Sequence, residues 1–250
     1  LGDPESMELP FTALLEPAYL RRRAALLPPP GRVGDSDRVG AGRPLPESDD
    51  TTHLCVFDPE GGCVSLTTTV NALFGSRWLV PGLGFFLNDE MDDFDTRPGR
   101  PNLYGLVGRG VNRVEGGRRP LSSMSPVVVL RDGAPWLALG GRGGPRILSG
   151  VLQVLVARWH DGLPLARAVG APRLHHQWRP DRVDLEEGRL DPALRRALRE
   201  MGYRVEVVES NGKVHAAERF PDGRCTGAAD ARDAGMAAVL PRAFGPGPDQ

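Results

Sequence analysis

The sequence predicts a layered α+β domain, and three observations support this interpretation. Residues 51–70 contain two β-rich segments joined by a glycine-containing turn, which predicts a hairpin. Short apolar segments within 125–140 are followed by a glycine run and an amphipathic segment, a pattern typical of strands leading into a helix. A second helical pattern at 190–203 precedes two alternating segments. Strands on either side of paired helices indicate an α+β or α/β/β/α arrangement.

Composition excludes several classes of protein. The 250 residues are 40% hydrophobic and 25% charged, as in soluble globular domains. The formal net charge of −1 argues against a general nucleic-acid or membrane-surface binder, and no apolar run reaches the length of a membrane span. Cys55, Cys63 and Cys225 are too few for a disulfide framework and lack zinc spacing. Cys55 and Cys63 flank a turn where they could face each other, but reduced core thiols are expected.

The first fifty residues differ in amino-acid composition from the rest. Residues 16–27 predict one amphipathic helix, which the prolines that follow bring to an end. Residues 31–50 are rich in glycine, proline and aspartate, which indicates a loop or tail open to cleavage. We therefore divide the chain into a tail and linker, 1–50, and a catalytic domain, 51–250. Because the chain begins without methionine, we also expect sequence upstream of Leu1.

Two helices of the second region have clear signals. The first follows Pro145 and ends before Gly162, and its expected buried side consists of Ile147, Val151, Leu152, Leu155 and Trp159. The second has Asp191 as N-cap, Pro192 as its first residue and Gly202 past its end, with an apolar stripe of Leu194, Leu198 and Met201. The segments 204–209 and 213–220 alternate like exposed edge strands.

Four short motifs have both a purely structural interpretation and a chemical one. The run "GGRGG" at 140–144 is a tight turn, an oxyanion hole or a phosphate loop without the Lys-Ser/Thr ending, and taken alone it favours the turn. The acids Asp89, Glu90, Asp92 and Asp93 form either a solvated loop or a site for a cation or ammonium group. Ser122 and Ser123 form a turn or bind a carboxylate. His175 and His176 favour a structural role over metal binding.

The order of the motifs is more informative than any one of them. "TTH", "SLTTTVNALFGS", "PGLGFFLNDEMDDF", "PNLYGLVG", "RRPLSSMSP", "GGRGGPRI" and "APRLHHQWRPD" together strongly resemble the small subunit of the γ-glutamyltranspeptidases. The resemblance runs from Thr51 to about the C-terminus, and residues 1–50 resemble the tail of that family's large subunit. It implies an N-terminal-nucleophile hydrolase, a four-layer α/β/β/α sandwich of which the small-subunit portion is present.

The resemblance also implies a mechanism. A precursor, or zymogen, cuts itself between Asp50 and Thr51, and Thr51 becomes the nucleophile. The freed α-amino group, with an ordinary pKa of about 7.7–8.0, is a base within reach of the hydroxyl of the same residue. Thr69 corresponds to the threonine that hydrogen-bonds the nucleophile, and Gly143 and Gly144 to the oxyanion hole.

The resemblance also implies how the substrate is bound: its positive and negative groups lie against different sets of residues. The α-amino group of a γ-glutamyl compound such as glutathione is expected at Asn71, Glu90 and Asp93, and its α-carboxylate at Ser122 and Ser123. Residues 98–108, with Tyr104, resemble a lid. Water, an amino acid or a peptide would accept the acyl group. The implied partner is the precursor's large subunit, and no cofactor, metal or nucleic acid is implied.

Two departures and two alternatives accompany this interpretation. Asp89 replaces an asparagine that is usual in the family, and Arg142 stands where a small residue or proline is usual. One alternative is a related acylase, of the cephalosporin type, with a different acyl substrate. The other is an inactive fragment that needs its large subunit. The chain alone indicates no cellular location, although family members are often periplasmic or extracellular.

Overall fold

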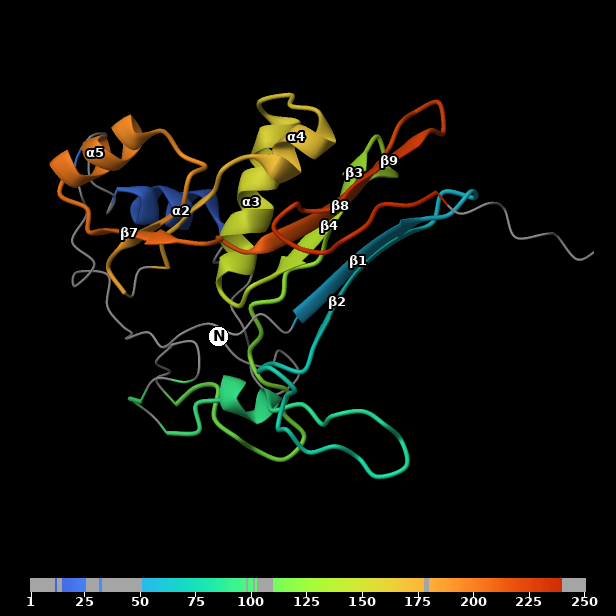
Figure 1. Cartoon of the computed structure of the whole chain (residues 1–250), viewed down its shortest axis with the longest axis vertical. Coiled ribbons are helices and arrows are strands. Elements are labelled where there is room, and N and C mark those ends of the chain that lie inside the picture. Colours follow the sequence, from blue (N-terminus) through green and yellow to red (C-terminus); the bar gives the residue numbers. More distant parts are fainter. Residues whose placement is uncertain are drawn as a thin grey trace, which may run out of the picture.

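The computed structural model describes residues 12, 15–25, 32, 51–97, 99–100, 102, 110–177 and 180–239, and its strands form three sheets (Figure 1). The largest sheet has the order β3-β4-β8-β9, a second consists of the hairpin β1-β2, and the third has the order β5-β6-β7. The strands are β1 (Thr51–Phe57), β2 (Cys63–Thr69), β3 (Val127–Arg131), β4 (Ala134–Arg142), β5 (Leu174–His175), β6 (Val183–Glu186), β7 (Val205–Val208), β8 (Lys213–Arg219) and β9 (Cys225–Ala228). The helices are α2 (Pro17–Ala24), α3 (Arg146–Trp159), α4 (Leu165–Gly170) and α5 (Pro192–Glu200), with a 3₁₀ turn, η2 (Glu90–Asp93).

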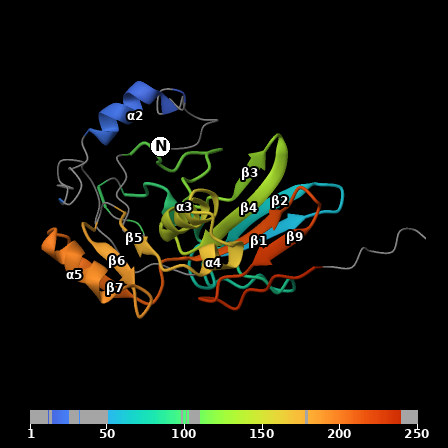
Figure 2. The ribbon, with the colours of Figure 1, turned by 90° about the horizontal axis from the view of Figure 1, so that it is seen from above.

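The four-stranded sheet is the middle layer of the main body. Helices α3 and α4 pack on one face of it, and the hairpin β1-β2 packs on the other (Figures 1 and 2). Strand β4 is consequently buried on both faces from Trp136 to Gly141, and its sequence is a continuous run of apolar and small residues. The main core lies between the helices and this sheet, and it is lined by Trp136, Leu137, Leu139, Ile147, Val151, Val154, Ala157, Leu165, Ala168, Val169, Val214, Ala216 and Ala228.

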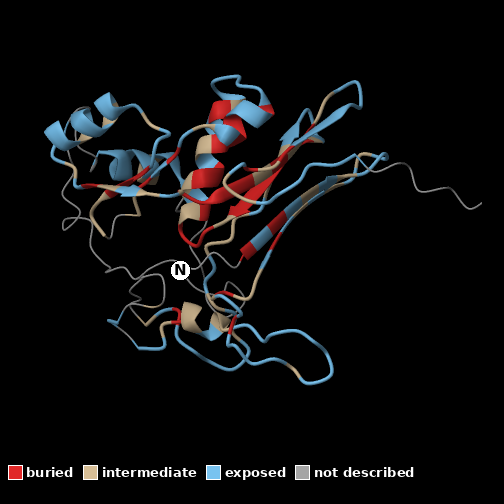
Figure 3. Ribbon diagram, viewed as in Figure 1, coloured by how far each residue is buried: buried red, intermediate tan, exposed pale blue. Residues whose placement is uncertain are grey.

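Helix α3 confirms the predicted helix, but its buried side differs from the expected one. Ile147 and Val151 are buried in the main core as expected, together with Val154 and Ala157. Figure 3 shows the buried residues along α3 and along the strands beside it. Leu152 and Trp159 are instead 59% and 68% exposed, and Leu155 is only partly buried. The expectation was wrong for Leu152 and Trp159 because the helix carries apolar residues on two sides, and the sequence pattern does not show which side meets the sheet.

The third sheet lies to one side of the main layers and has a small core of its own, Val183, Leu185 and Val205 (Figure 2). Helix α5 packs against it through Leu198, and the helix begins where its sequence signals predict. The Asp191 carboxylate accepts a hydrogen bond from the Ala193 N–H at 2.8 Å, which caps the helix. Leu194, Leu198 and Met201 form its least exposed side.

Two other expectations need correction. Strand β7 is an edge strand as expected, but β8 lies between β4 and β9 and is largely buried. The sequence does not reveal β9, which is short and includes Gly227, and without β9 the strand β8 would stand at an edge.

Cys55 and Cys63 do not face each other: Cys55 lies opposite Ser65, and Cys63 lies opposite Phe57. All three cysteines are free thiols. No helix among the described residues is long and apolar enough to cross a membrane.

Candidate active site

Thr51 and Thr69 meet at one end of the hairpin β1-β2. The register places Thr51, the first residue of β1, opposite Thr69, the last residue of β2. The Thr51 hydroxyl donates a hydrogen bond to the Thr69 hydroxyl oxygen at 3.1 Å, and that oxygen also accepts the Asn71 N–H at 2.9 Å. Thr51 is only 5% exposed. The structure thus holds the Thr51 oxygen in a defined position beside a second hydroxyl.

The next inward-facing residue of β1, His53, is held as a neutral imidazole. Its Nδ1 lies 2.8 Å from the Thr67 hydroxyl oxygen, and its ring packs so closely on β4 that a Cβ at Gly140 would lie 2.2 Å from Cε1. Burial, and secondarily the charge of His215, lowers the pKa of His53 to about 4. His53 is therefore a weak base, and the structure gives it no hydrogen bond to Thr51 among the described residues.

Two contacts fix the direction of β1 along the large sheet. His53 lies against Gly140, while the hairpin turn accepts hydrogen bonds from Arg219 at the Asp58 and Pro59 carbonyls. Arg219 lies one residue beyond the Glu218–Leu137 pair, toward the start of β4. Strand β1 therefore runs antiparallel to β4. Its first residue, Thr51, lies toward the end of β4 from which the glycine run emerges.

The glycine run forms a turn between β4 and α3 that side chains would disturb. Gly143 and Gly144 have φ angles of 122° and 53°, which lie in the region that favours glycine. A Cβ on Gly143 would lie 3.0 Å from the Cα of Gly212. The carbonyls of Gly143 and Gly144 accept the first N–H groups of α3, so the turn is continuous with the helix N-terminus.

Arg142 precedes these glycines, and its guanidinium group binds the Asp233 carboxylate, with Nη2 and Nε each 2.7 Å from an oxygen. That pairing holds the charge of Arg142 at Asp233. The departure from the family pattern at this position thus has a defined partner in the structure.

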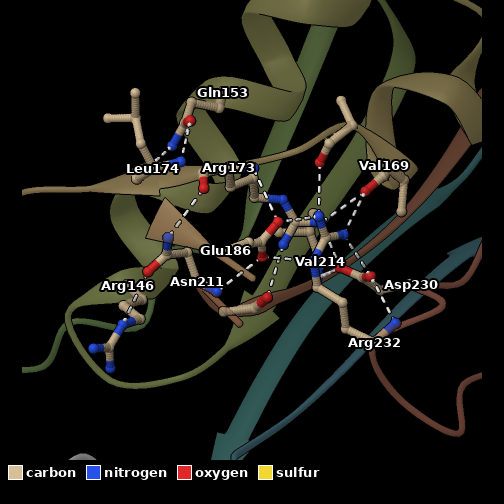
Figure 4. A network of polar contacts seen from close by, with 12 residues as sticks. Arg146, Gln153, Val169, Arg173, Leu174, Glu186, Asn211, Val214, Asp230 and Arg232 are labelled. Carbon is tan, nitrogen blue, oxygen red and sulfur yellow. Dashed lines mark hydrogen bonds and ion pairs between the residues drawn. The ribbon is translucent and has the colours of Figure 1, made fainter. Parts of the chain in front are cut away.

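A buried network of charges supports the other side of the same turn (Figure 4). Arg173 donates to the Gly212 carbonyl at 2.8 Å and to the Asp230 carboxylate at 2.5 Å. Arg232 binds both Asp230 and Glu186. All four charged side chains are at most 2% exposed. Because Gly212 packs on Gly143, this network holds the backbone behind the glycine turn. Sequence reasoning missed it, since it joins three separate segments of the chain, at Arg173, at Glu186 and at Asp230 with Arg232.

The acidic residues lie just beyond Thr69. Asn71 Nδ2 donates to the Asp89 carbonyl at 3.3 Å, and an Asp89 carboxylate oxygen accepts the Ala72 N–H at 2.8 Å. Glu90 and Asp93 share a hydrogen bond in η2. In Figure 1 the described part of the segment 71–123 lies below the strand ends that carry Thr51 and Thr69. The Asp89 side chain thus binds the backbone of Ala72, whereas Asn71 is bound by the Asp89 backbone.

The Glu90–Asp93 pair is poised to change its protonation. Burial, and then the charge of Glu90, raises the pKa of Asp93 to about 7. The pKa of Glu90 is raised as well, mainly by burial. One buried oxygen of Glu90 has no hydrogen-bond partner among the described residues. Two carboxyls that hold a proton between them would release it readily to accommodate an ammonium group.

Ser122 and Ser123 lie on an extended segment that leads into β3. The Ser122 hydroxyl oxygen accepts the Met124 N–H at 3.1 Å, and the Ser123 carbonyl accepts the Ser125 hydroxyl at 3.2 Å. The backbone just before Ser122 is joined to the acidic segment through Asn112, which sequence reasoning also missed. Asp50, Tyr104 and most of the segment 98–108 lie outside the described residues.

The adjacent histidines take part in separate local interactions. His175 Nδ1 lies 2.7 Å from the Ser149 hydroxyl oxygen, and His176 Nε2 lies 3.2 Å from an Asp181 oxygen. Among the described residues no cluster of three or more histidines, cysteines or acids has the spacing of a metal site.

Comparison with known proteins places this arrangement in a family. The sequence model of the γ-glutamyltranspeptidases matches residues 1–240. The glutathione hydrolase proenzyme of Escherichia coli is 41% identical over 233 residues, which are 93% of this chain and 40% of that protein. The acylase ACY 1 proenzyme of a Pseudomonas strain is 34% identical and matches 91% of this chain and 38% of its own length. The chain thus spans about two fifths of the length of these relatives.

The solved structures agree on the fold. The γ-glutamyltranspeptidase of Helicobacter pylori, determined as a T380A mutant, matches with a TM-score of 0.71 and 42% identity, over 73% of this chain and 100% of the matched one. This chain accordingly has the α+β fold of the N-terminal-nucleophile hydrolases, and the described residues contribute one helical and two sheet layers to it. With a family match over nearly its whole length, the chain belongs to the γ-glutamyltranspeptidase family.

Proposed function

We propose that this chain is the catalytic portion of a γ-glutamyltransferase and glutathione hydrolase, with Thr51 as its nucleophile. One observation carries the proposal: Thr51 is buried at the start of β1, with its hydroxyl 3.1 Å from that of Thr69. A free amino group at this residue would lie beside its own hydroxyl. The relatives are named proenzymes, which supports the proposal that this chain is part of a precursor that is cut before it acts.

The proposed reaction begins with cleavage between Asp50 and Thr51. The new α-amino group, with an ordinary pKa of about 7.7–8.0, then takes the proton of the Thr51 hydroxyl as the oxygen attacks the γ-carbonyl carbon of the substrate. His53 is unsuited to this task because its pKa is only about 4. The protonated amine gives its proton to the leaving amine. A γ-glutamyl ester on Thr51 remains, and water or an amino group then accepts the acyl group.

The glycine turn is proposed to stabilise the oxyanion that forms during each attack. Gly143 and Gly144 follow the end of β4 toward which Thr51 lies, and neither has a side chain that would keep a substrate from their N–H groups. Thr69 would hold the Thr51 oxygen in the attacking position. Removal of one donor from such an oxyanion hole typically costs about 2.7–4 kcal/mol of barrier.

Recognition of the glutamyl group is proposed to follow charge. Asn71, Glu90 and Asp93 would receive the α-ammonium group, and Ser122 and Ser123 the α-carboxylate. The Glu90–Asp93 pair supports this assignment, because two partly buried carboxyls in contact are stabilised by a cation. Tyr104 and the segment 98–108 would close over the substrate.

The remainder of the proposed enzyme is the large subunit of the same precursor. This chain spans 40% of the length of the Escherichia coli relative, so the segments that would complete the sandwich are expected outside it. The exposed apolar residues of the outer hairpin face, Leu54, Val56, Val64 and Leu66, are consistent with further packing there.

A related acylase is the second candidate, because the acylase ACY 1 proenzyme is 34% identical to this chain. The carboxyl pair favours the first candidate, since a glutaryl group has no α-amino group to bind there. Turnover of γ-glutamyl and glutaryl anilides distinguishes the two. We expect a clear preference for the γ-glutamyl compound, whereas a preference for the glutaryl compound would favour the acylase.

Substitution of Thr51 tests the proposal, with the protein expressed together with any coding sequence that precedes Leu1. Thr51→Ala should block cleavage and lower turnover by at least about 10⁴-fold, as loss of a catalytic nucleophile does elsewhere. Thr51→Ser keeps a hydroxyl and should retain both activities in part. A Thr51→Ala protein that still hydrolyses a γ-glutamyl anilide would show that the proposal is wrong.

A further inference from the structure

Asn112 joins the two segments that the proposed function assigns to opposite ends of the substrate. Its side chain is buried, with the residue 6% exposed. Its Nδ2 donates to the Asp93 carbonyl at 2.7 Å, and its Oδ1 accepts the Leu121 N–H at 3.1 Å. Both partners are backbone groups of fixed polarity, so they determine which way the amide points. One planar side chain therefore spans the space between the two backbone segments.

The two partners are adjacent to the proposed binding groups. The Asp93 carbonyl belongs to the same residue as one carboxyl of the acidic pair. Leu121 directly precedes Ser122 in the chain. The Asn112 amide thus lies between the backbone that carries the ammonium-binding acids and the backbone that carries the carboxylate-binding hydroxyls.

The backbone of Asn112 is held as firmly as its side chain. Its carbonyl accepts the Asp95 N–H at 2.7 Å, and its own N–H donates to the Asp95 carboxylate at 3.2 Å. The same carboxylate oxygen accepts the Gly110 N–H at 2.9 Å. These bonds bring the two ends of the segment 96–111 together. Asn112 therefore has little freedom to move relative to the acidic segment.

We propose that Asn112 is a positioning residue that sets the separation between the two poles of the binding site, and so selects substrates with an α-amino acid head group. The proposal rests on the proposed function. The ammonium and carboxylate groups of an α-amino acid are attached to one carbon, so their separation is nearly constant. A site that binds both must keep its partners at a matching distance, and a shift of about 1 Å is enough to weaken it.

Two substitutions test the role by different means. Asn112→Asp keeps the oxygen that accepts the Leu121 N–H but replaces the donor to Asp93 with a second oxygen, so the two segments should separate. Asn112→Gln keeps both the donor and the acceptor on an arm longer by one methylene group. In either variant, kcat/KM for a γ-glutamyl anilide should fall by about tenfold or more, mostly because KM rises.

The selective readout is the ratio of kcat/KM for γ-glutamyl and glutaryl anilides. A glutaryl group engages only the carboxylate pole, so its kcat/KM should change less than about threefold and the ratio should fall. Asn211→Asp is the matched control: Asn211 is also a buried asparagine whose amide donates to backbone carbonyls, but it lies in the charge network. It should affect both substrates alike and leave the ratio unchanged.

The outcomes separate this proposal from the proposed function. A wild-type protein that does not prefer the γ-glutamyl compound contradicts the proposed function, whatever Asn112 does. A wild-type protein with that preference and an Asn112→Gln variant with an unchanged ratio contradicts the positioning role alone. Complete cleavage at Thr51 and an unchanged unfolding temperature in that variant identify a folded protein, and Asn112→Asp provides the second test if Gln is not tolerated.

Discussion

The two halves of the proposed site are built in different ways. The half with Thr51, Thr69 and the glycine turn stands at the ends of strands and at the start of a helix, so a sheet and its ladder of backbone hydrogen bonds determine its geometry. The described part of the half between Asn71 and Ser123 contains one short 3₁₀ turn, one isolated β-bridge between Leu79 and Phe86, and otherwise loops. There, side chains that bind backbone groups, above all Asn112 and Asp95, replace the ladder.

This difference has a functional meaning. A reaction that many acyl compounds share requires one rigid arrangement of nucleophile and oxyanion donors, and regular structure provides it. Recognition of a particular head group is commonly placed on loops that a rigid scaffold supports. We therefore expect changes in the strand-built half to affect every substrate, and changes in the loop-built half to affect only substrates with an α-amino group.

The largest effect on stability is expected in the network behind the glycine turn. Asp230→Ala leaves the buried Arg173 without its carboxylate partner and leaves Arg232 with Glu186 alone, which should lower the free energy of unfolding by about 3–5 kcal/mol. Urea unfolding measures the change. Asp222→Ala, in an exposed pair with Arg224, is the control and should have little effect. Equal stability of the two variants would contradict a supporting role for the network.

The next effect concerns catalysis in the strand-built half. Gly143→Ala introduces a side chain at a φ angle of 122° and against Gly212, so the oxyanion donors should move. We expect kcat to fall by about 10²–10³-fold for γ-glutamyl and glutaryl anilides alike. Gly133→Ala is the matched control, because Gly133 also has a positive φ angle but lies in open space. A change confined to KM would place Gly143 outside the oxyanion hole.

A smaller and more selective effect is expected in the loop-built half. Glu90→Gln removes one charge from the pair that would hold the ammonium group, and hydrogen bonds to charged groups contribute about 1.5–3 kcal/mol. KM for a γ-glutamyl anilide should therefore rise by about tenfold or more, while kcat changes little. Glu60→Gln, on the exposed hairpin turn, should leave both unchanged. Equal losses with a glutaryl anilide would contradict the assignment.

The mildest test is a change of pH. Burial and the neighbouring Glu90 raise the pKa of Asp93 to about 7, so the pair gains a proton as the pH falls through 7. Protonation weakens the attraction for an ammonium group, and KM for the γ-glutamyl anilide should rise below pH 7 by at most about tenfold per unit. The glutaryl anilide lacks the ammonium group, so the pH dependence of its KM is the control for groups that titrate elsewhere in the protein. Parallel pH profiles for KM would contradict the prediction.

The same proton also affects the stability of the protein in the absence of substrate. The pKa of Asp93 is higher in the folded protein than its ordinary value of 3.8, so the folded state binds the proton more strongly than the unfolded state. The contribution of this group to stability is therefore present at low pH and is lost as the pH rises through about 7. Asp93→Asn should remove this part of the pH dependence of unfolding.

Sequence reasoning anticipated the parts of the fold that depend on local signals. The hairpin that begins at Thr51, the helix after the glycine run and the capped helix at Asp191 all have turn, cap or periodicity signals. The strand β9 and the buried side of α3 were missed or misplaced, because they depend on which surfaces meet. The roles of Asn112 and of the Arg173–Asp230 pair likewise arise only from contacts between distant segments.

The most direct test of Thr51 as nucleophile is the mass of the protein, measured intact and after brief reaction with a slowly hydrolysed γ-glutamyl substrate. The active protein should contain a fragment that begins at Thr51, and that fragment should gain the mass of one γ-glutamyl group at its N-terminal residue. A fully active protein with an unbroken Asp50–Thr51 bond, or with the acyl group on another residue, would contradict the proposed mechanism.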